Sequence, residues 1–132
     1  MYLLDTNICI YAMKGKYPAL TKKLFAVSPS EIAVSSITLA ELEYGCAKSK
    51  WGSRSRNVMN MFLSAFALIP FEQIDSVRYG RLRAELEKNG DIIGPYDLQI
   101  AAQGLARGLT IVTHNVSEFE RVPGLKIEDW TE

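Results

Sequence analysis

The chain has 132 residues, of which 48% are hydrophobic and 23% are charged, and its 15 basic and 15 acidic side chains balance. This composition predicts one globular domain, residues 1–132, and excludes an intrinsically disordered chain. A net charge of zero gives no sign of a polyanionic partner, although basic side chains gather at residues 48–56 and 78–83.

Short apolar runs alternate with amphipathic segments along the chain. In chain order we expect a strand at 2–4, helices at 6–13 and 19–27, a strand at 32–35, a helix at 36–48, a loop or helix start at 51–56, a helix at 58–66, a strand at 67–71, helices at 74–88 and 96–107, a strand at 109–112 and an edge strand at 125–127. Strands separated by helices predict an α/β fold with three layers, α/β/α, around a mostly parallel sheet of about five short strands.

The apolar runs are too short for a membrane span, which needs ~18 apolar residues. Asp5 interrupts the first run, so we expect no signal peptide. Cys9 and Cys46 lie among apolar residues and have the spacing of neither a zinc site nor a redox pair. Buried free thiols are typical of a reducing compartment, and we therefore expect a cytoplasmic protein.

Acidic side chains stand where expected strands end or expected helices begin, namely Asp5, Glu41, Asp97 and Glu118. Each has a structural explanation on its own. Asp5 could cap a helix, and Glu41 has the spacing of a capping box with Thr38. Asn115 has the same spacing to Glu118, and an aspartate in a first helical turn, such as Asp97, is favoured by the helix dipole.

Together these acids indicate a metal site. Asp5 and Glu118 follow expected buried strands, and parallel sheets bind ligands beyond the carboxyl ends of their strands. If the helices that carry Glu41 and Asp97 begin at the same edge, the carboxylates converge and repel one another unless a cation neutralises them. Oxygen ligands favour Mg²⁺ or Mn²⁺ over zinc, and Mg²⁺ keeps waters for a phosphate substrate. The pattern therefore predicts phosphoryl chemistry.

Other mechanisms find no support in the sequence. A single histidine, His114, excludes RNA cleavage by a pair of histidines without a metal. The chain has neither a phosphate-binding GxxxxGK[ST] loop nor a nucleophile elbow. A haloacid-dehalogenase-like phosphatase needs a second acid where Asn7 stands, and a phospho-receiver domain needs further acids that are absent. Attack by a metal-activated water remains.

Four segments, LLDTNICIY, SSITLAELEYG, GPYDLQIAAQ and IVTHNVSEFERVPGLKIEDW, resemble in order and spacing the PIN-domain ribonucleases of the VapC toxin family. The resemblance extends from Tyr2 to Trp130 and is greatest to the enterobacterial-type subgroup. It implies a single PIN domain and an endoribonuclease that depends on Mg²⁺, for which Mn²⁺ can substitute. The expected substrate is structured RNA, above all the anticodon stem-loop of initiator tRNA.

The resemblance also implies partners. It predicts the toxin of a type II toxin–antitoxin pair, held inactive by a VapB-type antitoxin whose arginine enters the acidic cleft. Relatives form homodimers within larger assemblies, and operator DNA is contacted only through the antitoxin. The alternative, from a non-enzyme class, is a degenerate PIN module that binds RNA or a protein without cleavage.

By position, the resemblance assigns roles to single residues. Asp5, Asp97 and Glu41 are the expected metal ligands. Glu118 is the fourth expected catalytic acid, and it is left open whether it binds the metal directly or through water. The residues expected to orient these carboxylates are Thr6, Asn7, Thr113 and Asn115.

Overall fold

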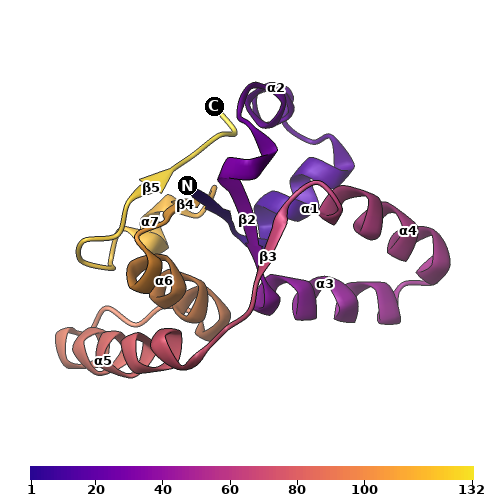
Figure 1. The fold of residues 1–132 in the computed structure, drawn as a ribbon. Coiled ribbons are helices and arrows are strands. Elements are labelled where there is room, and N and C mark those ends of the chain that lie inside the picture. The colour runs from indigo at the N-terminus through magenta and orange to yellow at the C-terminus, as the bar shows by residue number, and fades with distance from the viewer.

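The computed structural model describes all 132 residues and contains one five-stranded sheet (Figure 1). Its strands are β1 (Tyr2–Leu4), β2 (Ile32–Ser35), β3 (Ala67–Ile69), β4 (Thr110–Val112) and β5 (Ile127–Glu128). Every neighbouring pair is parallel, in the order β3-β2-β1-β4-β5. The predicted parallel sheet is thus confirmed, with β3 and β5 at its edges.

The helices are α1 (Thr6–Lys14), α2 (Pro18–Ala26), α3 (Ser36–Lys48), α4 (Gly52–Leu63), α5 (Gln73–Asn89), α6 (Pro95–Arg107) and α7 (Val116–Phe119). Most predicted helices have nearly these bounds. The helix expected at 58–66 instead begins at Gly52 and ends at Leu63. It ends early because the chain must turn before it enters β3. The short α7 was expected only as a capping pattern.

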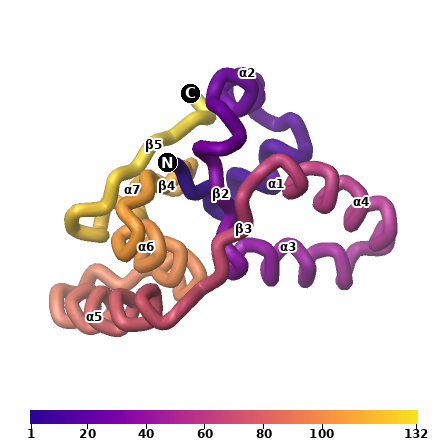
Figure 2. Tube along the Cα trace, in the orientation of Figure 1, coloured from indigo at the N-terminus to yellow at the C-terminus, as the bar shows by residue number.

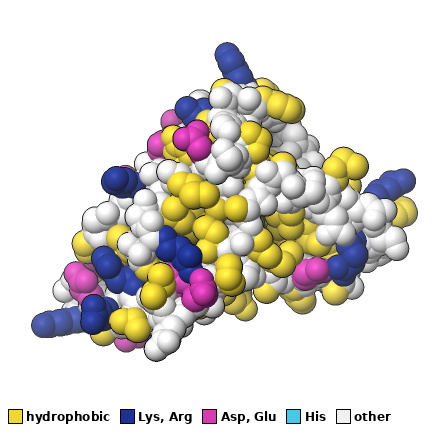
Figure 3. Space-filling view, viewed as in Figure 1, with side chains coloured by type: hydrophobic (Ala, Val, Ile, Leu, Met, Phe, Trp, Pro, Cys, Tyr) yellow, Lys and Arg dark blue, Asp and Glu magenta, His cyan; other side chains and the backbone are white.

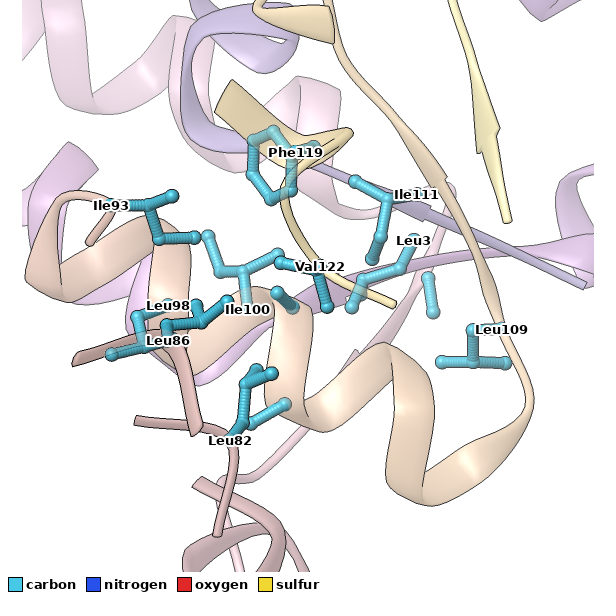
Figure 4. Packing of buried hydrophobic residues seen from close by; sticks show 13 residues of the cluster. Leu3, Leu82, Leu86, Ile93, Leu98, Ile100, Leu109, Ile111, Phe119 and Val122 are labelled. Carbon is cyan, nitrogen blue, oxygen red and sulfur yellow. The ribbon is translucent and has the colours of Figure 1, made fainter. Parts of the chain in front are cut away.

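Alternating side chains of the sheet build two cores, one on each face. Leu3 and Ile111 point to the face covered by α5, α6 and α7, where they pack near Phe119 (Figure 4). Leu4 and Val112 point to the opposite face, which α1 to α4 cover. The trace shows these two groups of helices on either side of the strands (Figure 2). The predicted three-layer α/β/α fold is confirmed.

Glycines in the left-handed conformation end the two helices beside the first core. Gly90 ends α5 with φ 72° and Gly108 ends α6 with φ 66°. A side chain at either position would strain the backbone, whereas glycine adopts this conformation without strain. Its backbone N–H then donates to a carbonyl in the last turn of the helix. The sequence predicts both ends correctly.

The surface leaves some apolar area open. Hydrophobic side chains gather over the middle of the face on which β3 lies (Figure 3), and Leu68 of β3 is 51% exposed. Cys9 and Cys46 are both buried and unpaired, as expected. None of the helices is long and apolar enough to cross a membrane.

Candidate active site

Asp5 lies at the carboxyl end of β1 and begins α1. Its backbone N–H donates to the Val112 carbonyl at 3.0 Å, which extends the ladder between β1 and β4 by one residue. Its carboxylate accepts a hydrogen bond from the Ile8 backbone N–H at 2.8 Å and so caps α1, as predicted. Asp5 is only 2% exposed. The cap therefore fixes an acidic group inside the edge of the sheet.

Glu41 lies one turn further along its helix than the sequence suggests. The chain enters α3 directly from β2, and Ser35 is the N-cap, with its hydroxyl accepting from the Ile37 N–H at 3.0 Å. The capping-box interpretation of Thr38 and Glu41 is therefore wrong, because Ser35 already fills that role. Glu41 stands in the second turn of α3, and its side chain is free to face α1.

Two threonines hold the Glu41 carboxylate. The Thr6 hydroxyl donates to Glu41 Oε1 at 2.7 Å, and the oxygens of Thr6 and Thr38 lie 3.0 Å apart. Since the Thr6 proton is used on Glu41, the Thr38 hydroxyl donates to Thr6. Thr38, fully buried, is a site residue that the sequence reasoning missed. The only signal was that it precedes Glu41 by three residues, on the same face of α3.

Asp97 and Glu118 meet beside the start of α6. Asp97 is in the first turn of that helix, as predicted. Glu118 Oε1 accepts from the Gly94 backbone N–H at 2.6 Å, and its other oxygen accepts from the Asn115 side-chain amide. Asn115 makes no capping bond to α7, so the capping interpretation is wrong there too, because its amide is committed to Glu118. Glu118 thus ties α7 to the loop before α6.

Two more residues were expected to orient the carboxylates. Thr113 belongs to the hydrogen-bond network of the acids, and Asn7 does not. The Thr113 hydroxyl bonds to Asp5 and accepts from the Asn115 backbone N–H at 2.9 Å. Asn7, in contrast, is exposed in the first turn of α1 and takes part in none of these hydrogen bonds.

The four acids share one electrostatic environment. Burial, followed by the charge of Glu41, raises the pKa of Asp5 to about 6, against the opposing effect of hydrogen bonds from Thr113 and Ile8. Burial raises the pKa of Asp97 to about 7, and the charges of Glu118, Asp5 and Glu41 add to it. None of the five ion pairs in the structure involves these acids. The cluster therefore carries negative charge that no ion pair within the chain neutralises.

The donor set suits a hard divalent cation. It consists of carboxylate and hydroxyl oxygens, which Mg²⁺ prefers. No three Asp, Glu, His or Cys side chains lie in an arrangement that would hold an ion directly. Mg²⁺ typically binds one or two carboxylates and keeps several waters, so a site with few direct protein ligands is consistent with it.

These carboxylates predict an unusual pH dependence of stability without metal. In the folded protein Asp5 and Asp97 have pKa values of about 6 and about 7, above the ordinary value of 3.8, so the folded state binds more protons than the unfolded chain. The free energy of unfolding should therefore fall as pH rises through these values. In metal-free urea denaturation, Asp97→Asn should be more stable than the wild type at about pH 8, but similar to it at about pH 4.

Added Mg²⁺ should raise the stability of the wild type at the higher pH and raise that of Asp97→Asn less, since bound cation stabilises the folded state. An equal difference between the two proteins at both pH values would contradict the charge cluster.

Comparison with known proteins gives consistent matches along the chain. The PIN domain model matches residues 2–125. The chain is 42% identical to the tRNA(fMet)-specific endonuclease VapC of Salmonella typhimurium, over 98% of this chain and 97% of that protein. It is 43% identical to ribonuclease VapC2 of Rickettsia felis, over 98% of each.

Solved structures agree. The crystal structure of VapBC2 from Rickettsia felis bound to a DNA fragment from their promoter superimposes with a TM-score of 0.92 and 42% identity, covering 98% of both chains.

Proposed function

This chain belongs to the PIN domain family, and from that premise we propose that it is a toxin endoribonuclease that cleaves RNA by metal-dependent hydrolysis. PIN nucleases generally depend on a divalent metal. The observation that carries the proposal is the convergence of Asp5, Glu41, Asp97 and Glu118 at the carboxyl edge of β1 and β4, with raised pKa values for Asp5 and Asp97. A set of mutually repulsive acids, one of them buried and three partly exposed, is costly unless a cation neutralises it.

We assign Asp5, Asp97 and Glu41 as the residues that would hold the cation, in part through its bound waters, and we take the cation to be Mg²⁺ with Mn²⁺ as a substitute. When bound, such an ion polarises a phosphate oxygen and makes a bound water more acidic. Glu118 accepts hydrogen bonds through both oxygens already, so we assign it a role through water.

The rest of the network prepares these groups for the reaction. Thr6 and Thr38 hold one oxygen of Glu41 in place, and Thr113 does the same for Asp5. Pre-positioned carboxylates need little reorganisation when the phosphate arrives. A carboxylate of the cluster is also placed to accept the proton of the attacking water.

We infer the substrate and partners from relatives that match the chain over nearly its full length. Their names support tRNA, and initiator tRNA in particular, as the target. VapBC complexes with promoter DNA support a VapB-type antitoxin as the inhibitor and as the part that contacts DNA. Insertion of an antitoxin arginine would neutralise the same acids. The open apolar area around Leu68 supports a homodimer, and a tRNA substrate implies action in the cytoplasm.

The test is cleavage of a total tRNA pool by the purified full chain. With Mg²⁺ or Mn²⁺ we expect one dominant cut in one tRNA species, leaving a 5′-phosphate and a 3′-hydroxyl, and no cleavage after addition of a chelator. Cleavage that survives the chelator would exclude the metal mechanism. Binding without any cleavage, with metal present, would favour the degenerate PIN module instead.

A further inference from the structure

Three aromatic rings lie together beside the acidic cluster. Tyr11 is on α1, Tyr17 is the residue before α2, and His114 follows β4. The centroid of the Tyr17 ring lies 5.3 Å from that of Tyr11 and 5.4 Å from that of His114. The interplanar angles are 75° for the two tyrosines, 44° for Tyr17 and His114, and 78° for Tyr11 and His114. No pair is stacked face to face; Tyr11 and Tyr17 are half-buried against the second core, and His114 is exposed.

The His114 ring is held in one orientation. Its Nδ1 lies 3.1 Å from Asp129 Oδ2 and 2.9 Å from the Thr131 hydroxyl oxygen. The Thr131 hydroxyl donates to Asp129 Oδ1 at 2.7 Å, so both neighbours of Nδ1 act as acceptors. Nδ1 must then carry the hydrogen, and Nε2, which has no partner in the chain, is left on a side chain that is 44% exposed.

Asp129 is itself fixed as a carboxylate. Burial would raise its pKa, but hydrogen bonds from Thr131 and from His114 outweigh that effect and hold the pKa below its ordinary value. Asp129 and Thr131 belong to the C-terminal segment, which runs past α2 (Figure 1), so this segment braces the His114 ring. These hydrogen bonds order the His114 ring although it is exposed. Ordering a side chain costs conformational entropy, which most exposed side chains retain.

Positive charge accompanies the rings. The Lys16 ammonium lies 4.7 Å from the centroid of the Tyr11 ring and 5.5 Å from that of Tyr17. His114 directly follows Thr113, whose hydroxyl bonds to Asp5, so the rings adjoin the acids. An RNA phosphate that approaches four carboxylates is repelled, and a cation beside the adjoining rings offsets part of this repulsion.

We propose that Tyr11, Tyr17 and His114 form a base-binding subsite that stacks an unpaired nucleotide of the RNA next to the cleaved phosphate, with Lys16 on the RNA backbone. This rests on the ribonuclease function proposed above. Proteins recognise single-stranded loops and bulges by stacking bases on aromatic side chains, while paired bases are not available to them. The subsite therefore selects RNA in which a base can leave its stack at the cut.

The test uses the full chain and a hairpin RNA with 2-aminopurine in its unpaired loop, whose fluorescence falls when the base stacks. Binding is measured with an Asp5→Asn form, which binds without cutting. We expect quenching that Tyr17→Phe retains and that Tyr17→Leu loses, with affinity reduced roughly 10-fold or more. His114→Leu should also lose the quenching. Lys16→Ala should weaken binding and lower the slope of log affinity against log salt by about 1.

Phe25→Leu is the matched control, since Phe25 is an exposed aromatic on α2, 88% exposed, outside the cluster. It should leave quenching and affinity unchanged. Far-ultraviolet circular dichroism and thermal unfolding identify any variant that fails to fold. If a ring variant does not fold, Lys16→Ala still tests the proposal, because Lys16 is exposed and its replacement should not affect folding.

The outcomes separate the two proposals. If the wild type cleaves RNA with Mg²⁺ while Tyr17→Leu, His114→Leu and Lys16→Ala bind the hairpin as tightly as Phe25→Leu, the subsite is wrong and the ribonuclease stands. Retained quenching in Tyr17→Leu would also overturn the subsite. If the wild type binds with ring-dependent quenching but never cleaves, the ribonuclease function fails and the base-binding site stands.

Discussion

Replacement of Asp5 by asparagine is expected to reduce metal-dependent RNA cleavage by about 10³-fold or more. The loss follows from the several kcal/mol of transition-state stabilisation that a catalytic cation supplies, at about 1.4 kcal/mol for each factor of ten. Asparagine keeps the shape of the side chain and can still accept from the Ile8 N–H, so α1 remains capped. Single-turnover cleavage of a tRNA substrate measures the effect, at saturating protein and over a range of Mg²⁺ concentrations.

Asp5→Asn should at the same time become more stable than the wild type in metal-free buffer at neutral pH, since it removes one charge from a repulsive cluster. Lower activity with higher stability rules out unfolding as the cause. Glu85→Gln is the matched control, an exposed acid on α5 that should keep full activity. Cleavage within tenfold of the wild type would remove Asp5 from the metal site.

The sheet was predictable because its three central strands, β1, β2 and β4, are largely buried. Segments such as Tyr2–Leu4 and Ile32–Ser35 are short, mostly apolar runs, and polar capping residues, Asp5 and Ser35, mark where the helices after them begin. Parallel strands place their carboxyl ends at one edge, so Asp5 could be assigned to that edge from its position after β1 alone. The position of Asp97 was equally predictable, because the Gly-Pro step before it marks the start of a helix.

The hydrogen bonds of the site were not predictable in the same way. A capping box and a helix-interior Thr–Glu pair have the same three-residue spacing, and only the point at which β2 becomes α3 decides between them. That point is set by Ser35, which caps the helix. The contact from Gly94 to Glu118 joins residues 24 apart in sequence, and it depends on how α7 packs against the α6 loop.

A buried ion pair was likewise not predictable, because no pattern in the sequence indicates it. Arg107, at the end of α6, donates from Nε to Asp75 Oδ1 at 3.1 Å and from Nη2 to Asp75 Oδ2 at 2.9 Å. It also reaches Glu72 Oε1 at 2.9 Å. Asp75 is fully buried and accepts from the Glu72 N–H at 2.8 Å. The pair joins the start of α5 to the end of α6, two of the three helices that cover one face of the sheet.

Replacement of Arg107 by methionine is expected to lower the free energy of unfolding by about 3 kcal/mol, because it leaves the Asp75 carboxylate buried without a counter-charge. The value is at the lower end for a buried pair, since the Arg107 side chain is 22% exposed and water screens part of the interaction. Urea denaturation at neutral pH measures the loss. Adding Asp75→Asn should recover part of it, because the amide oxygen still accepts from the Glu72 N–H without a buried charge.

The exposed pair of Arg83 and Glu87 provides the matched control, with side chains 56% and 51% exposed. Arg83→Met removes the same kind of charge from the neighbouring surface of α5 and should leave the unfolding midpoint almost unchanged, because solvent screens such a pair. The contrast isolates burial as the cause, since both variants replace an arginine by a methionine next to a carboxylate. If Arg107→Met costs no more than Arg83→Met, the Asp75 site is open to water, and α5 is held against α6 by apolar contacts such as those of Leu82 and Leu86 alone.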